Sequence, residues 1–305
     1  MKKSGKKITD ITIKDVKNYL IDERYKIKKE VESFTDLPKM MFSTMSPVFF
    51  VSTGRAGSEL LVRLMNESKI GSVYHEPRPR MFYGSKLVFE KNVEVQTKKI
   101  AYLSARYDLL KKAYLEEKRF VETNNRNTFF MRALGELFPK AKFIQLVRHP
   151  GDFVRSGIRR KYYSGNENDD SRITPLVNDQ YNKDWKILSD IERIGWLWNA
   201  TYNFIEEEKS HLNADNIIIV KSEDLFSNPQ TYNKICAFLE HDPLSERKIT
   251  SIIKKPINKQ KQSAYPKWNE WSEEDMNKLI KMTPLGVTYG YWKRIAKKIL
   301  ISLYC

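Results

Sequence analysis

Cysteine, clustered histidine and long apolar runs are scarce in this 305-residue sequence, and each scarcity excludes a class of protein. The two cysteines, Cys236 and Cys305, are too few for a disulfide framework or a cysteine-based metal site. The four histidines show no ligand spacing, so we expect no metal. No apolar run approaches the roughly 20 residues that cross a bilayer, and the basic start is not followed by an apolar export segment. These features favour a cytoplasmic protein.

Positive charge, in contrast, is in excess. The net charge of +16 produces a field that attracts anions such as a nucleotide, an acidic glycan, nucleic acid or an anionic membrane face. Because the lysines are spread along the chain, the charge also fits a role in solubility alone. The tryptophans fit core anchors better than base-stacking platforms, so nucleic acid is not an expected partner.

The most informative stretch joins a strand, a glycine-containing loop and a helix. Val48–Val51 is an apolar run, Thr53–Ser58 is polar, and leucines then recur at helical spacing. Gly54 and Gly57 permit conformations in which several N–H groups face one anion, near the positive end of the helix. A nucleotide triphosphatase loop would need a lysine before the hydroxyl residue, whereas a glycine stands there, so a metal-dependent phosphoryl transferase is disfavoured. A tight connection without a ligand is the alternative.

A second unit places an arginine at the end of a strand. The predicted strand Lys142–Val147 leads to Arg148, Pro150 opens a helix, and Ser156 lies about two turns into that helix. A guanidinium fork and a hydroxyl suit a monoester phosphate. The alternative is that Arg148 caps a carbonyl or pairs with Asp152, with Ser156 packed in its helix.

Further strands are predicted within 69–80, within 119–125 and at 216–221, the last of them as a buried strand, and helices follow them. This alternation predicts an α/β fold with a mainly parallel central sheet flanked by helices. Residues 164–185 lack any period and are predicted to form a substrate loop. A helical insertion is predicted at 86–118 from repeats at Ile100, Leu103, Tyr107, Leu110 and Tyr114.

The predicted organisation has three parts. Residues 1–40 form a charged, partly helical extension, 41–295 form one domain, and 296–305 form a basic amphipathic tail. The helix from Tyr291 to the end fits packing better than contact with a membrane surface, which is the alternative.

Read in order, the two units and the basic loop at 254–271 resemble the sulfotransferases that use 3′-phosphoadenosine 5′-phosphosulfate. The resemblance covers about residues 47–290 and implies a three-layer, P-loop-like fold with this co-substrate and no metal. In that family an Arg-Ser-Gly-Thr loop, here Arg55-Ala56-Gly57-Ser58, binds the 5′ phosphosulfate, and an arginine and a serine matching Arg148 and Ser156 bind the 3′ phosphate. The donor-binding residues that it implies are Thr53, Gly54, Arg55, Ala56, Gly57, Ser58, Glu59, Arg148, Ser156 and Lys267.

The resemblance also implies the catalytic residues Glu76, Arg55 and Arg78. Glu76, within His-Glu-Pro-Arg, falls where carbohydrate and protein-tyrosine members carry a catalytic base, and Arg55 is the candidate for stabilising the leaving phosphate. Alternatively, Glu76 is a surface ion-pair partner of Arg78. Two features depart from the family pattern: Glu59 replaces a hydroxyl residue, and Thr123–Asn125 replaces a stretch with lysine and proline. A carboxylate at position 59 would repel the 5′ phosphate unless it turns outward.

The function that these residues predict is transfer of a sulfuryl group to an acceptor hydroxyl, with a glycan favoured over a lipid or a tyrosine peptide. Two other hypotheses stay open at this point. One is a basic module that binds a polyanion without chemistry, and the other is an atypical nucleotide kinase that requires magnesium.

Overall fold

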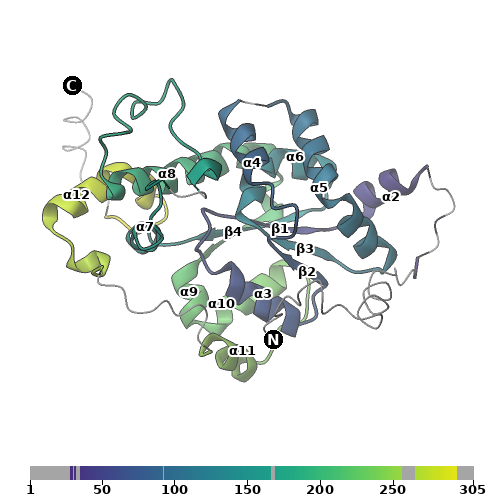
Figure 1. The fold of residues 1–305 in the computed structure, drawn as a ribbon. Helices are drawn as coiled ribbons and strands as arrows, with labels where there is room; N and C mark the ends of the chain where they lie inside the picture. The colour runs from purple at the N-terminus through teal and green to yellow at the C-terminus, as the bar shows by residue number, and fades with distance from the viewer. Residues whose placement is uncertain are drawn as a thin grey trace, which may run out of the picture.

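The computed structural model describes residues 28–29, 31, 35–91, 93–165, 169–255 and 265–293. The predicted tail at 296–305, most of the predicted extension at 1–40 and the middle of the basic loop at 254–271 lie outside these ranges. At the centre is a sheet of five parallel strands in the order β2-β3-β1-β4-β5 (Figure 1). The strands are β1 (Val48–Val51), β2 (Ser72–His75), β3 (Phe120–Thr123), β4 (Lys142–Val147) and β5 (Ile217–Lys221).

Helices cover both faces of the sheet, as Figure 1 shows. Those whose apolar residues join the core on the upper face are α2 (Leu37–Thr44), α4 (Phe82–Glu90), α5 (Val95–Leu115), α6 (Met131–Leu137), α7 (Pro150–Ile158), α8 (Asp190–Glu208) and α12 (Glu273–Met282). Those on the lower face are α3 (Ser58–Glu67), α9 (Ser222–Ser227), α10 (Pro229–Phe238) and α11 (Glu246–Ile253). Short 3₁₀ turns are η2 (Asn125–Phe130), η3 (Asp169–Ser171), η4 (Lys209–His211), η5 (Ala214–Asn216), η6 (Trp268–Glu270) and η7 (Pro284–Gly286).

The alternation of side chains along β1 explains the two cores. Phe49 and Val51 belong to the upper core, whereas Val48 and Phe50 belong to the lower one. Because both faces of a parallel sheet are covered, all four of these residues are buried, and the strand reads as a continuous apolar run. The predicted fold class, a three-layer P-loop-like α/β fold, is confirmed.

Two expectations need correction. The strand predicted to be buried at 216–221 is β5, which lies at the sheet edge and leaves Ile219 50% exposed, because an apolar run does not reveal how many neighbours a strand has. In α5 the inner face is formed around Tyr102 and Arg106, so Ile100, part of the apolar repeat, is 66% exposed. No helix within the described ranges is long and apolar enough to span a bilayer.

Candidate active site

The loop between β1 and α3 has a backbone shape that favours anion binding. Gly54, Arg55 and Gly57 all have positive φ angles, of 81°, 55° and 96°. Turns that include left-handed residues form concavities in which successive backbone N–H groups bind an anion. Gly57 also caps α3 without a side-chain hydrogen bond, so no capping side chain occupies the first N–H groups of that helix.

Buried polar contacts fix this loop from behind. Thr128 exchanges two hydrogen bonds with the backbone of Ser52, at 3.0 and 3.1 Å, and the Ser52 hydroxyl accepts from the Gly54 N–H at 3.0 Å. Ser222 donates to the carbonyl of the buried Ala56 at 2.8 Å. The loop therefore keeps its shape through contacts with two distant chain segments.

A cavity of about 240 Å³ lies beside this loop and beyond β4. Arg148, at the end of β4, lines it together with Arg55, and the Arg148 Nη1 donates to the Arg55 carbonyl at 2.7 Å. One N–H of Arg148 therefore caps a carbonyl, as in the alternative stated above. Arg148 nevertheless lines the same cavity as Arg55. The lining residues are Arg55, Gly57, Ser58, Glu59, Leu60, Arg148, Asp152, Arg155, Ser156, Arg159, Arg160 and Phe226.

One face of α7 and the turn after it supplies five of these residues. Asp152, Arg155, Ser156, Arg159 and Arg160 lie three, four, seven and eight positions apart, which is the spacing of one helix face. Ser156 is buried and accepts a hydrogen bond from Arg160 Nη1 at 3.0 Å. Among these five residues the sequence prediction includes only Ser156, although the same helical spacing also indicates Arg155, Arg159 and Arg160.

Positive charge dominates the cavity, because five arginines and two carboxylates line it. Burial lowers the pKa of Arg148 and of Arg160, and the neighbouring Arg55 lowers both further. Glu59, whose position departs from the family pattern, is 3.4 Å from Arg63 on its own helix. An anion with several charges would relieve the repulsion among the arginines, so this cavity suits a phosphate-rich ligand.

The basic loop at 254–271 ends against the start of α7. Trp268 stacks on His149 with ring centroids 4.0 Å apart, and Arg155 Nε donates to the Pro266 carbonyl at 2.8 Å. Lys267, between those two anchors, is exposed and does not line the cavity. Its donor-binding role stays a prediction.

Glu76 and Arg78 follow the carboxyl end of β2, as the anion-binding loop follows the carboxyl end of β1, and both residues are exposed. The Glu76 N–H donates to the Thr123 carbonyl at 3.1 Å, which extends the pairing of β2 with β3 by one residue. Neither side chain lines the arginine-rich cavity. Their catalytic roles remain predictions that depend on the ends of the strands lying at one edge.

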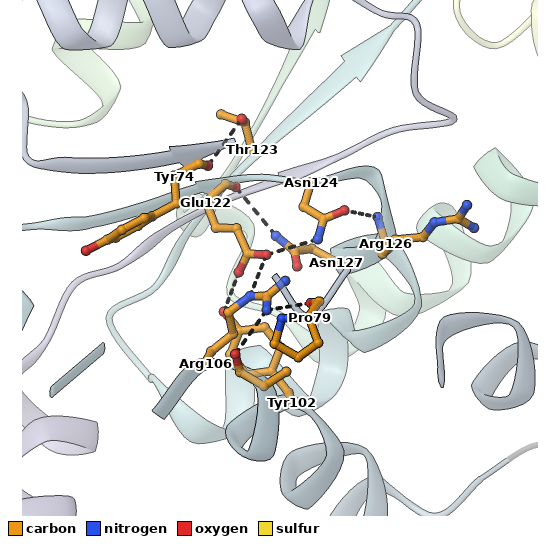
Figure 2. A network of polar contacts seen from close by, with 10 residues as sticks. Tyr74, Pro79, Tyr102, Arg106, Glu122, Thr123, Asn124, Arg126 and Asn127 are labelled. Carbon is orange, nitrogen blue, oxygen red and sulfur yellow. Dashed lines mark hydrogen bonds and ion pairs between the residues drawn. The ribbon is translucent and has the colours of Figure 1, made fainter. Parts of the chain in front are cut away.

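A buried ion pair holds the segment after β2 in place (Figure 2). Arg106 Nε donates to Glu122 at 2.9 Å, and Arg106 Nη1 donates to the Pro79 carbonyl at 2.9 Å. The Tyr102 hydroxyl and the Asn124 amide donate to the same carboxylate, at 2.8 and 3.0 Å. The network joins α5 to the end of β3 through Glu122, and to the segment that carries the candidate base through Arg106.

The departure at Thr123–Asn125 has a structural role. Thr123 Oγ1 is 2.7 Å from His75 Nδ1, and Asn124 accepts from the Arg126 N–H at 3.0 Å. A Cβ atom added to Gly54 would meet the Asn125 amide at 3.3 Å. These side chains fix the junctions of β2, β3 and the loop after β1.

Comparison with known proteins places these observations in a family. A model of the sulfotransferase family matches residues 47–246. A search of curated proteins found no significant match. Similar solved structures include sulfotransferase STF9 from Mycobacterium avium (9% identity, 91% of this chain and 81% of that chain covered, TM-score 0.49). They also include the sulfotransferase domain of the Synechococcus PCC 7002 olefin synthase (19% identity, 81% of this chain and 96% of that chain covered, TM-score 0.47). A third is mouse sulfotransferase SULT7A1 complexed with PAP (14% identity, 82% of this chain and 88% of that chain covered, TM-score 0.42).

Proposed function

This chain belongs to the sulfotransferase family, and from that premise we propose that it transfers a sulfuryl group from 3′-phosphoadenosine 5′-phosphosulfate to a hydroxyl group of a glycan. The observation that carries the proposal is the cavity shared by Arg55 and Arg148, which are 93 residues apart in sequence. The loop after β1 offers backbone N–H groups to one phosphate, and Arg148 with Ser156 offers a guanidinium and a hydroxyl to another.

The proposed reaction is an in-line displacement at sulfur. A bond forms between the acceptor oxygen and sulfur while the bond from sulfur to the 5′ phosphate oxygen breaks, and adenosine 3′,5′-bisphosphate leaves with the electron pair. Glu76 takes the proton of the acceptor hydroxyl, a contribution of about 100- to 10,000-fold in rate. Arg55 stabilises the charge that grows on the leaving phosphate, and Arg78 is a second cation beside the base.

The strand order sets the separation between the candidate base and the loop after β1. β3 separates β2, which leads to Glu76, from β1, which leads to Arg55. Neighbouring strands lie about 4.8 Å apart, so the two strand ends are separated by about 10 Å. In the proposed reaction the acceptor hydroxyl lies between a donor at the first loop and a base at the second.

Calorimetry with adenosine 3′,5′-bisphosphate tests the donor site directly. We expect Arg148→Ala to weaken binding by roughly 10- to 100-fold, because it removes charge-assisted hydrogen bonds. The matched control is Arg132→Ala on α6, which removes the same charge from an exposed pair with Glu136 and should leave the affinity unchanged. A polyanion-binding module without chemistry predicts a slight, salt-dependent loss for both variants instead.

Turnover with labelled donor then tests the acceptor. Neutral glycans, acidic glycans, lipids and tyrosine peptides should be screened with the wild-type protein, and transfer to a glycan supports the proposal. Transfer to lipid or peptide alone would contradict the glycan assignment, and tight nucleotide binding without transfer to any of them would favour the binding module.

A further inference from the structure

A second cavity, of about 30 Å³, also adjoins the loop after β1. Ser52 and Thr53 line it from that loop, Asn125 and Arg126 from η2, and Arg172 from the residues after η3. A water-sized group needs about 10 to 15 Å³ of such space, so the cavity holds about two of them. The two oxygens of one carboxylate have that size.

Arg126 has an unused donor in this region. Its Nη1 and Nη2 donate to the carbonyl and hydroxyl of Ser171, at 3.0 and 3.3 Å. Its Nε is buried and has no hydrogen-bond partner among the described residues. A buried guanidinium N–H without an acceptor is costly, and an oxyanion placed against it would remove that cost.

A second arginine, Arg172, lines the same cavity. Arg172 donates from Nε to Asp169 at 2.9 Å and lies over the ring of Tyr162, 3.4 Å from its centroid. Burial, followed by repulsion from Arg172, lowers the pKa of Arg126 to about 10, while Glu76 acts in the opposite direction. Asp169 compensates the charge of Arg172, whereas Arg126 forms no ion pair with a carboxylate among the described residues, so Arg126 supplies the uncompensated positive charge at this cavity.

We propose that this cavity binds an anionic group on the acceptor, so that the preferred acceptor is an acidic sugar with its carboxylate against Arg126 and Arg172. The proposal rests on the sulfotransferase function above. Thr53 lines the second cavity, while Arg55, two residues on in the same loop, lines the first. Both cavities adjoin the loop after β1, so an acceptor anchored in the second cavity lies beside the donor site proposed in the first, and Glu76 is near enough for its charge to act on Arg126.

Matched acceptors test the proposal. With adenosine 3′,5′-bisphosphate binding confirmed first, labelled donor is offered with p-nitrophenyl β-glucuronide and p-nitrophenyl β-glucoside, which differ by a carboxylate. A second series of turnover assays compares three polysaccharide acceptors: one with uronic acids, one that is sulfated and one that is neutral. We expect kcat/KM to be at least 10-fold higher for the acidic member of a pair, and a preference confined to sulfated polymers would assign the cavity to a sulfate ester. Turnover of neutral sugars alone, or of none of the acidic ones, overturns the proposal, and absence of nucleotide binding overturns the donor function as well.

Variants locate the effect at the cavity. Arg126→Gln and Arg172→Gln should each raise KM for the acidic acceptor by roughly 10- to 100-fold, with a smaller change in kcat. Their affinity for adenosine 3′,5′-bisphosphate should match that of the wild type, which also shows that they fold. Arg132→Gln on α6 is the charge-matched control and should leave the selectivity between acidic and neutral acceptors unchanged. Loss of turnover on both acceptors in equal proportion, with no change in selectivity, would refute the assignment of the two arginines.

Discussion

Removing the cation of the buried pair should destabilise the fold and disturb the candidate base together. Both side chains of the pair Arg106–Glu122 are 0% exposed. Arg106→Met keeps most of the side-chain length but leaves a buried carboxylate without a cation, which typically costs about 3 to 5 kcal/mol. Tyr102 and Asn124 still donate to that carboxylate, so we expect the lower end, about 3 kcal/mol.

The measurement is urea unfolding, compared through the midpoint at an unchanged slope. Arg132→Met is the control, because it breaks a pair with Glu136 in which both side chains are more than a third exposed, and should cost less than about 1 kcal/mol. In the double variant Arg106→Met with Glu122→Gln, no buried charge is left, so much of the lost stability should return. A loss below about 1 kcal/mol in the single variant, or a double variant no more stable than the single one, would refute this reasoning.

The same variant has a catalytic consequence. Arg106 donates to the Pro79 carbonyl, three residues after Glu76 (Figure 2). Without that bond the segment loses an anchor, so kcat should fall in the folded variant while the affinity for adenosine 3′,5′-bisphosphate stays unchanged. An unchanged kcat would show that the anchor has no part in positioning the base.

Three further predictions follow from the site. Glu76→Gln should lower kcat by about 100- to 10,000-fold and leave nucleotide affinity nearly unchanged in calorimetry, since the change removes only the base; surviving turnover would place the base elsewhere. Burial lowers the pKa of His149 from 6.5, so the unfolded chain binds more protons near neutral pH. The free energy of unfolding should therefore fall as the pH drops below about 6.5. Urea titrations at pH 7.5 and 5.5 measure this fall, which should be smaller in His149→Gln. An equal fall in the variant and the wild type would show that His149 is not its source. Gly57→Ala should cost about 1 to 2 kcal/mol, because its φ is +96°, and should weaken nucleotide binding in calorimetry; wild-type affinity would show that the loop tolerates the change.

The sequence predicts the parts of the fold that depend on local signals. Val48–Val51 and Lys142–Val147 are strands at the predicted residues, and Pro150 begins α7 as expected, because an apolar run ending at polar or helix-starting residues is a local pattern. Another local signal is Ser272, a residue type favoured at helix starts, which caps α12 by accepting from the Asp275 N–H at 3.1 Å. These signals need no knowledge of neighbours in space.

Features set by distant partners were missed for a physical reason. A hydrophobic count cannot place Arg106 inside, since its burial depends on Glu122, 16 residues away on another element. Ile219 is apolar but has a strand on only one side. Arg172, on the aperiodic loop, reaches the second cavity only through the tertiary fold.

The strand order explains why the sequence predicts the residues of the first cavity and not those of the second. β1 and β4 are neighbours, but the chain leaves β1 into α3 on the lower face and leaves β4 into α7 on the upper face (Figure 1). Such a point, where consecutive connections diverge, opens a crevice beyond the carboxyl ends of the strands. Each wall of this crevice is one strand with the first turns of its own helix, so each wall has a local sequence motif. The second cavity is walled instead by the residues after β1, the 3₁₀ turn η2, the loop after η3 and helix α8. These segments share no sequence motif, so only the folded chain brings Arg126 and Arg172 together.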